Sequence, residues 1–106
     1  MKATIWHNPR CSKSREALAL LNDAGAEVTI VEYLKTPPTR EELARLYARG
    51  GISPRAAMRK DAPKVDSDAA ALDAMAADPA LIERPLVETE KGVVIARPPE
   101  RVRDLL

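Results

Sequence analysis

The chain has 106 residues, which is enough for one domain with a modest core and too few for a second domain. Its 17 basic and 16 acidic residues nearly balance, so we expect no nucleic-acid partner and no attachment to an anionic membrane. The single cysteine excludes an internal disulfide, and with only one histidine the chain lacks the ligand clusters of a zinc site. Because the sequence shows neither a signal peptide nor a long apolar run, we expect a cytoplasmic protein, and we expect it to be a monomer.

The first third of the chain predicts a strand, a helix and a second strand. The apolar run Ala3–Trp6 stops at the polar, proline-containing His7-Asn8-Pro9, as a strand does. Apolar residues then recur at helical spacing over residues 17–24, and Gly25 suits the end of that helix. Residues 28–34 are rich in β-branched side chains, which predicts a second strand that runs parallel to the first through a right-handed crossover.

The middle of the chain is predicted to be helical. Residues 39–49 begin with the Thr-x-x-Glu spacing of a capping box and carry an apolar stripe. Ser53-Pro54 repeats a helix-start signal and predicts a short helix that carries Met58 and Arg59. The alanine-rich residues 67–77 have strong helix propensity and predict a further helix.

The end of the chain predicts a β-hairpin and a last helix. Residues 85–89 and 92–96 form the two antiparallel strands, and residues 100–106 form the helix. We also predict a cis Arg84-Pro85 bond, because X-Pro bonds alone have an appreciable cis population. This order of elements predicts a thioredoxin-like α/β domain over residues 1–106, with a four-stranded mixed sheet flanked by helices and a helical insertion at about residues 39–80.

Cys11 falls at the carboxyl end of the first strand and near the start of the first helix. A helix start offers unpaired N–H groups and a partial positive charge, which favour a thiolate or a bound oxyanion. The helix contributes only about 0.3–1 kcal/mol, so cationic side chains must supply the rest. A lone cysteine is commonly a buried apolar residue, but the flanking Arg10 and Ser12 favour a reactive thiol here.

Four separated blocks of the chain together resemble the glutaredoxin-coupled arsenate reductase family, and they are His7–Arg15, Gly51–Lys60, Ile82–Val87 and Ala96–Pro98. The resemblance covers nearly the whole chain and keeps the order of the blocks. It implies that Cys11 is the nucleophile and that Arg59, Arg84 and Arg97 bind the oxyanion. It also implies that no cofactor is tightly bound and that no metal is involved.

The residue types fit these implied roles on physical grounds. A thiolate that attacks a tetrahedral oxyanion meets like-charge repulsion, and guanidinium groups bind such anions bidentately and remain charged. Arg84 precedes the strand-opening proline and Arg97 ends the hairpin, so we expect both to reach the end of the sheet. The spacing of Arg59 does not define its reach, and a single arginine is commonly a solvated surface residue.

Neighbouring polar residues are predicted to support the thiol. Short polar side chains at His7, Asn8 and Ser14 can donate hydrogen bonds that keep a thiolate ionised. His7 can equally be a turn residue bonded to the backbone. Arg15 either braces the loop or lowers the pKa of the thiol directly.

The resemblance implies reduction of arsenate to arsenite, with glutathione as co-substrate and glutaredoxin as redox partner. The lone cysteine fits this scheme, because no second thiol in the chain can resolve an adduct on Cys11. The segment from Asp61 to Ser67 is short compared with family members. A different oxyanion or a lower activity would follow if that stretch shapes the arginine site.

Three other functions are alternatives to arsenate reduction. A regulatory module that docks on RNA polymerase shares the fold but uses a C-x-x-C redox switch, and Ser14 stands at the second position here, so a disulfide sensor is excluded while docking is not. A cysteine phosphatase needs C-x5-R, and Ala17 occupies the arginine position. A glutaredoxin-like thiol transferase needs only one active cysteine and stays open.

Overall fold

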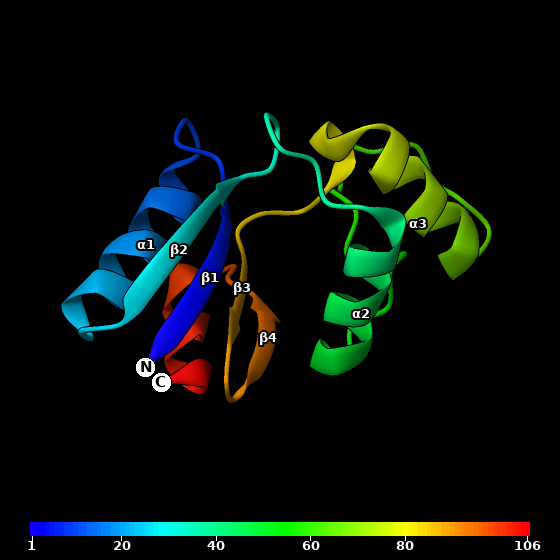
Figure 1. Ribbon diagram of the computed structural model, residues 1–106. Helices are drawn as coiled ribbons and strands as arrows, with labels where there is room; N and C mark the ends of the chain where they lie inside the picture. Colours follow the sequence, from blue (N-terminus) through cyan, green and yellow to red (C-terminus); the bar gives the residue numbers. More distant parts are fainter.

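A four-stranded mixed sheet forms the centre of the structure, a computed structural model that describes residues 1–106 (Figure 1). The strands are β1 (Lys2–His7), β2 (Glu27–Glu32), β3 (Leu86–Thr89) and β4 (Gly92–Ile95), in the order β2-β1-β3-β4. β1 runs parallel to β2 and antiparallel to β3, so that Ile5 lies between Ile30 and Val87. The predicted mixed sheet is confirmed.

Helices cover both faces of this sheet. The helix α1 (Ser12–Asp23) and the C-terminal 3-10 helix η2 (Pro99–Leu105) pack together on one side, and α2 (Arg40–Gly50) and α3 (Asp68–Ala77) lie on the other (Figure 1). Adjacent strand residues point to opposite faces, so Ile5 joins the core under α1 while Trp6 joins the core under α2. The central strands β1 and β3 are mostly buried, whereas the edge strand β2 has no buried residue and carries Glu27, Thr29 and Glu32.

The middle of the chain forms two of the three predicted helices. The Thr39 side chain accepts a hydrogen bond from the Glu42 backbone N–H at 3.1 Å, and α2 ends at Gly51 in the left-handed conformation with φ 64°. Ser67 caps α3 in the same way, by accepting from the Ala70 N–H at 3.0 Å. A 3-10 turn, η1 (Pro79–Leu81), then leads into β3.

The predicted short helix after Ser53-Pro54 is wrong. Residues in this stretch form turns, and Met58 makes an antiparallel bridge with Ile82. The Arg59 N–H donates to the Leu81 carbonyl at 2.9 Å, and the Glu83 N–H donates to the Ala57 carbonyl at 2.9 Å. These long-range hydrogen bonds use the backbone groups that a helix would need, and they fix Arg59 beside the segment that precedes β3.

The connection into β3 has the predicted cis Arg84-Pro85 bond. A second cis bond, Arg97-Pro98, follows β4 and was not predicted. Both X-Pro bonds lie at the same end of the β3–β4 hairpin, so Arg84 and Arg97 emerge from neighbouring strand ends. No helix of the structure has the length and apolar character needed to cross a bilayer.

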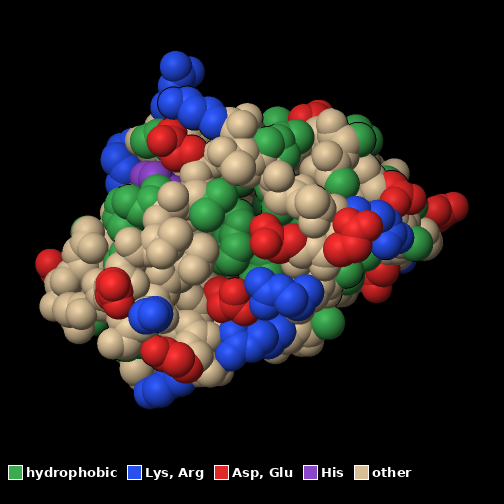
Figure 2. Space-filling view, in the orientation of Figure 1, with side chains coloured by type: hydrophobic (Ala, Val, Ile, Leu, Met, Phe, Trp, Pro, Cys, Tyr) green, Lys and Arg blue, Asp and Glu red, His purple; other side chains and the backbone are tan.

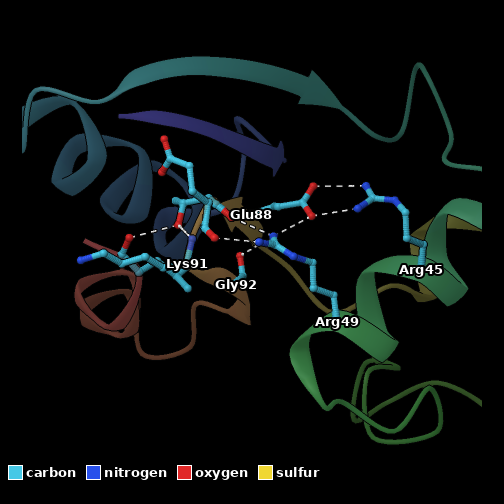
Figure 3. Close-up of polar contacts among 8 residues, drawn as sticks. Arg45, Arg49, Glu88, Lys91 and Gly92 are labelled. Carbon is cyan, nitrogen blue, oxygen red and sulfur yellow. Dashed lines mark hydrogen bonds and ion pairs between the residues drawn. The ribbon is translucent and has the colours of Figure 1, made fainter.

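Arg45 and Arg49 fasten α2 to the hairpin (Figure 3). Arg49 donates to the backbone carbonyls of Thr89 at 2.7 Å and Glu90 at 2.9 Å, and it shares Glu88 with Arg45. Arg45 binds the Glu88 carboxylate through both terminal nitrogens, at 2.9 and 3.1 Å. The space-filling view shows acidic and basic side chains interspersed over this face, in keeping with the near-zero net charge (Figure 2).

Candidate active site

Cys11 is the N-cap residue of α1 and is partly exposed. Its N–H donates to the Asn8 carbonyl and its carbonyl accepts from the Arg15 N–H, both at 3.0 Å, so a tight turn holds the thiol at the helix start. Burial raises the pKa of the Cys11 thiol, but the Ser14 backbone N–H, the charge of Arg84 and the Lys13 backbone N–H outweigh burial and hold the pKa below its usual value. The thiolate is therefore favoured.

Two arginines from the hairpin lie beside this sulfur. The Arg97 Nη1 atom is 3.9 Å from Cys11 Sγ and donates to the Arg84 backbone carbonyl at 3.2 Å. Arg84 stabilises the thiolate both by its charge and by a side-chain hydrogen bond. The structure thus brings Arg84 and Arg97 to Cys11 across the end of the sheet, which is where the sequence pattern predicts them.

Arg59 joins these groups around a cavity of about 210 Å³. Every side chain that lines this oxyanion cavity is ionisable, and the set is Arg59, Lys60, Asp61, Glu83, Arg84 and Arg97. The Nε atoms of Arg59 and Arg84 are buried and have no hydrogen-bond partner in the protein. A buried donor without a partner costs about 1–3 kcal/mol, so an acceptor oxygen that reached Arg84 Nε would remove that cost, whereas Arg59 Nε already has the Asp61 carboxylate 3.5 Å away.

Glu83 is the site residue that the sequence analysis missed. Its Oε1 atom lies 3.5 Å from Arg84 Nη1 and 3.9 Å from Arg97 Nε, and its side chain is only 14% exposed. The carboxylate therefore holds the two guanidinium groups together and partly neutralises them. The sequence feature that could have identified Glu83 is its position directly before Arg84, within a block that carries the family resemblance.

Tyr33 also borders the site from the end of β2. Burial raises the pKa of its hydroxyl, and the charge of Arg84 and a hydrogen bond from the Asn8 side chain oppose that shift. The hydroxyl of this buried residue consequently lies near both Arg84 and Cys11. The only sequence feature that could have placed Tyr33 at the site is its position just after β2, the strand that neighbours β1.

His7, Asn8 and Ser14 are joined by hydrogen bonds in the loop beside the sulfur. The buried Ser14 hydroxyl lies within hydrogen-bond distance of His7 Nδ1, at 2.6 Å, and accepts from the Asn8 N–H at 3.1 Å. Burial lowers the pKa of His7 despite the opposing charge of Glu32. A hydrogen bond from the Ser14 side chain to the thiolate stays a prediction.

Arg15 braces the same loop. Its Nη1 atom donates to the Pro9 carbonyl at 2.9 Å. Of the two interpretations offered for this residue, the hydrogen bond favours the bracing role.

Residues 6–105 match the model of the ArsC family. The chain belongs to the ArsC family. It is 44% identical to an arsenate reductase of Rhizobium meliloti over 115 aligned positions that cover 100% of the chain and 82% of the relative. It is 42% identical to an arsenate reductase of Escherichia coli K12, covering 97% of the chain and 79% of that protein.

Solved structures agree with the ArsC-family fold. An arsenate reductase from Vibrio cholerae superposes with a TM-score of 0.92 at 43% identity, covering 100% of this chain and 98% of that one. A putative arsenate reductase from Yersinia pestis superposes with a TM-score of 0.88 at 42% identity, covering 96% and 98%. The thioredoxin-like α/β fold class and the family resemblance are both confirmed.

The arrangement in this ArsC-family chain supports one kind of chemistry in particular. A sulfur of lowered pKa stands at the start of a helix, 3.9 Å from Arg97, and Arg97 lines a cavity together with two other arginines. Such a site binds a small tetrahedral oxyanion and allows the sulfur to attack its central atom.

Proposed function

We propose that this chain is an arsenate reductase that converts arsenate to arsenite with electrons supplied by thiols. The observation that carries the proposal is the Cys11 thiol of lowered pKa, 3.9 Å from Arg97, beside a cavity walled by charged side chains. Relatives named as arsenate reductases, identical at more than two residues in five, support the same substrate.

The first step is attack of the Cys11 sulfur on arsenic. An S–As bond forms and an As–O bond breaks, and the departing oxygen leaves as water after it takes up protons. Arsenic stays pentavalent in this step. Arg59, Arg84 and Arg97 would gather the negative charge of the remaining oxygens, and this charge is greatest in the transition state. The unpartnered Nε donor of Arg84 is available for that purpose.

The electrons come from outside the chain, because Cys11 is its only cysteine. Glutathione would condense with the adduct, so that an As–S bond replaces a second As–O bond and another water leaves. A glutaredoxin thiol then attacks the glutathione sulfur. The As–S bond breaks with both electrons left on arsenic, and the new disulfide joins glutathione to glutaredoxin.

Hydrolysis completes the cycle. Water replaces the Cys11 sulfur on trivalent arsenic and the thiol is regenerated. Arsenite is uncharged at neutral pH, so it loses the attraction that the arginines exert on arsenate. Glu83 is already placed to balance the arginines once the anion is gone. A cytoplasmic location, where glutathione is kept reduced, belongs to the same proposal.

A coupled assay tests the function. Purified protein is mixed with glutathione, glutathione reductase and glutaredoxin, and NADPH oxidation is followed with and without arsenate. We expect arsenate-dependent oxidation with the native chain and none with Cys11→Ser. Equal rates for the two proteins would refute the proposal. Turnover of a glutathionylated peptide without arsenate would instead support the thiol transferase alternative.

A further inference from the structure

A second cavity opens directly beside the oxyanion cavity. It has a volume of about 450 Å³ and is formed by residues between Ser53 and Val65. We call it the basic groove. Its volume falls in the range of about 300–1,000 Å³ that is typical of small-molecule sites.

The groove is strongly cationic. Arg55, Arg59, Lys60 and Lys64 line it and no carboxylate does. Residues 53–65 carry four basic side chains and one acidic one, whereas the whole chain has a net charge of only +1, so the rest of the molecule is net negative. Positive charge concentrated in one concave surface attracts and holds anions.

The basic groove adjoins the oxyanion cavity. Arg59 and Lys60 line both spaces. Asp61 faces the oxyanion cavity, where its Oδ1 atom lies 3.5 Å from Arg59 Nε. A ligand in the groove therefore lies against two residues that also line the oxyanion cavity.

The remaining walls accept an apolar or peptide-like body. Met58, Ala62 and Val65 contribute side chains between the cations. The backbone is held firmly, because the Arg59 N–H bonds Leu81 and the Ser53 hydroxyl donates to Asp68 at 2.9 Å. The groove thus combines a preformed floor with charges at its edges, as sites for small ligands do.

We propose that the basic groove binds the tripeptide thiol glutathione, with Arg55 and Lys64 holding its carboxylates and its sulfur directed at the arsenic bound to Cys11. This inference rests on the proposed function, which requires such a co-substrate. Glutathione has a carboxylate at each end and its thiol between them, so a molecule anchored at both ends presents the sulfur from its middle. The thiol proton leaves with the oxygen that the sulfur replaces on arsenic, and no electron transfer occurs at this stage.

The test reverses both charges with Arg55→Glu and Lys64→Glu in one protein. Both side chains are exposed, so we expect the fold to be retained. The KM for glutathione should rise about tenfold or more while the KM for arsenate changes less than about twofold. Glutathione diethyl ester, which lacks both carboxylates, should be used equally poorly by the native and the variant protein.

A matched control makes the same charge change elsewhere. Lys2→Glu with Arg103→Glu alters two exposed residues near the chain termini, which lie together at the end of the domain away from residues 53–65 (Figure 1). The control should leave the KM for glutathione unchanged. An equal rise in both double variants would overturn the inference, since the effect would then be one of net charge.

Two further outcomes also overturn it. One is an unchanged KM for glutathione in the groove variant, and the other is a rise confined to the KM for glutaredoxin, which would make the groove a protein-docking surface. A separate measurement distinguishes these failures from failure of the proposed function. It asks whether arsenate, in the absence of glutathione, slows the alkylation of Cys11 by iodoacetamide. If arsenate protects the thiol while the groove variant behaves like the native protein, only the groove inference is lost.

Discussion

Replacing Arg84 with lysine separates the charge of this residue from its hydrogen-bonding geometry. The Arg84 side chain is only 15% exposed and its buried Nε has no partner in the protein. Lysine keeps the positive charge near Cys11 but loses the planar fork and this free donor. Removing one preorganised donor to a developing oxyanion costs about 2.7 kcal/mol, which corresponds to a loss of about 100-fold in rate.

The predicted result has two parts. In the coupled assay, Arg84→Lys should lower kcat/KM for arsenate about 100-fold. In a separate assay with iodoacetamide, its Cys11 should react within about threefold of the native rate, because the charge that favours the thiolate is retained. Arg84→Gln serves as the comparison and should lose both arsenate reduction and thiol reactivity.

Either of two results would refute this reasoning. Native-like turnover in Arg84→Lys would show that a charge alone is sufficient and that the fork geometry has no role. A large fall in iodoacetamide reactivity of the lysine variant would show that the substitution disturbs the thiol itself. Unfolding in urea, measured on each variant, confirms that the compared proteins are equally folded.

Other predictions concern the loop and the clamp on α2. Ser14→Ala should lower the free energy of unfolding in urea by about 1–3 kcal/mol, because it leaves His7 Nδ1 without its buried partner. An unchanged free energy of unfolding would show that the Ser14–His7 hydrogen bond does not stabilise the fold. Arg49→Met should lower the free energy of unfolding by about 2 kcal/mol and Arg45→Met by under about 1 kcal/mol, since only Arg49 also binds backbone carbonyls. An equal loss of stability in the two variants would contradict this difference. Hydrogen bonding from Arg45, with the charges of both arginines, lowers the pKa of Glu88. Its stabilisation is therefore present above the unfolded pKa of about 4.3 and lost as the pH falls further, so the stability difference between native protein and Glu88→Gln should shrink below about pH 4.

Local signals in the sequence predicted the framework of the site. The change from alternating to helical spacing around Cys11 placed the thiol at the start of a helix, and the structure has it there as the N-cap of α1. The proline and hairpin patterns placed Arg84 and Arg97 at adjacent strand ends. These features depend on near neighbours in the chain, which is why spacing and turn chemistry were sufficient.

Long-range contacts account for what the sequence did not predict. The stretch after Ser53-Pro54 has a helix-start signal, yet its backbone bonds Leu81 and Glu83, about two dozen residues away, and so forms a bridge instead. The position of Arg59 follows from that bridge and not from its own spacing. Glu83 was missed for a similar reason, because its role arises only when the hairpin brings Arg97 beside Arg84.

Arsenate reduction by this chain depends on a Cys11 thiolate placed to attack an oxyanion held by arginines. The rate of Cys11 alkylation by iodoacetamide, measured as a function of pH with and without arsenate, tests it most directly. We expect the alkylation rate to stay high well below the pKa of a free thiol, about 8.5, and arsenate to suppress it in a saturable manner. A rate that follows ordinary thiol ionisation and does not respond to arsenate would refute the proposed role of Cys11.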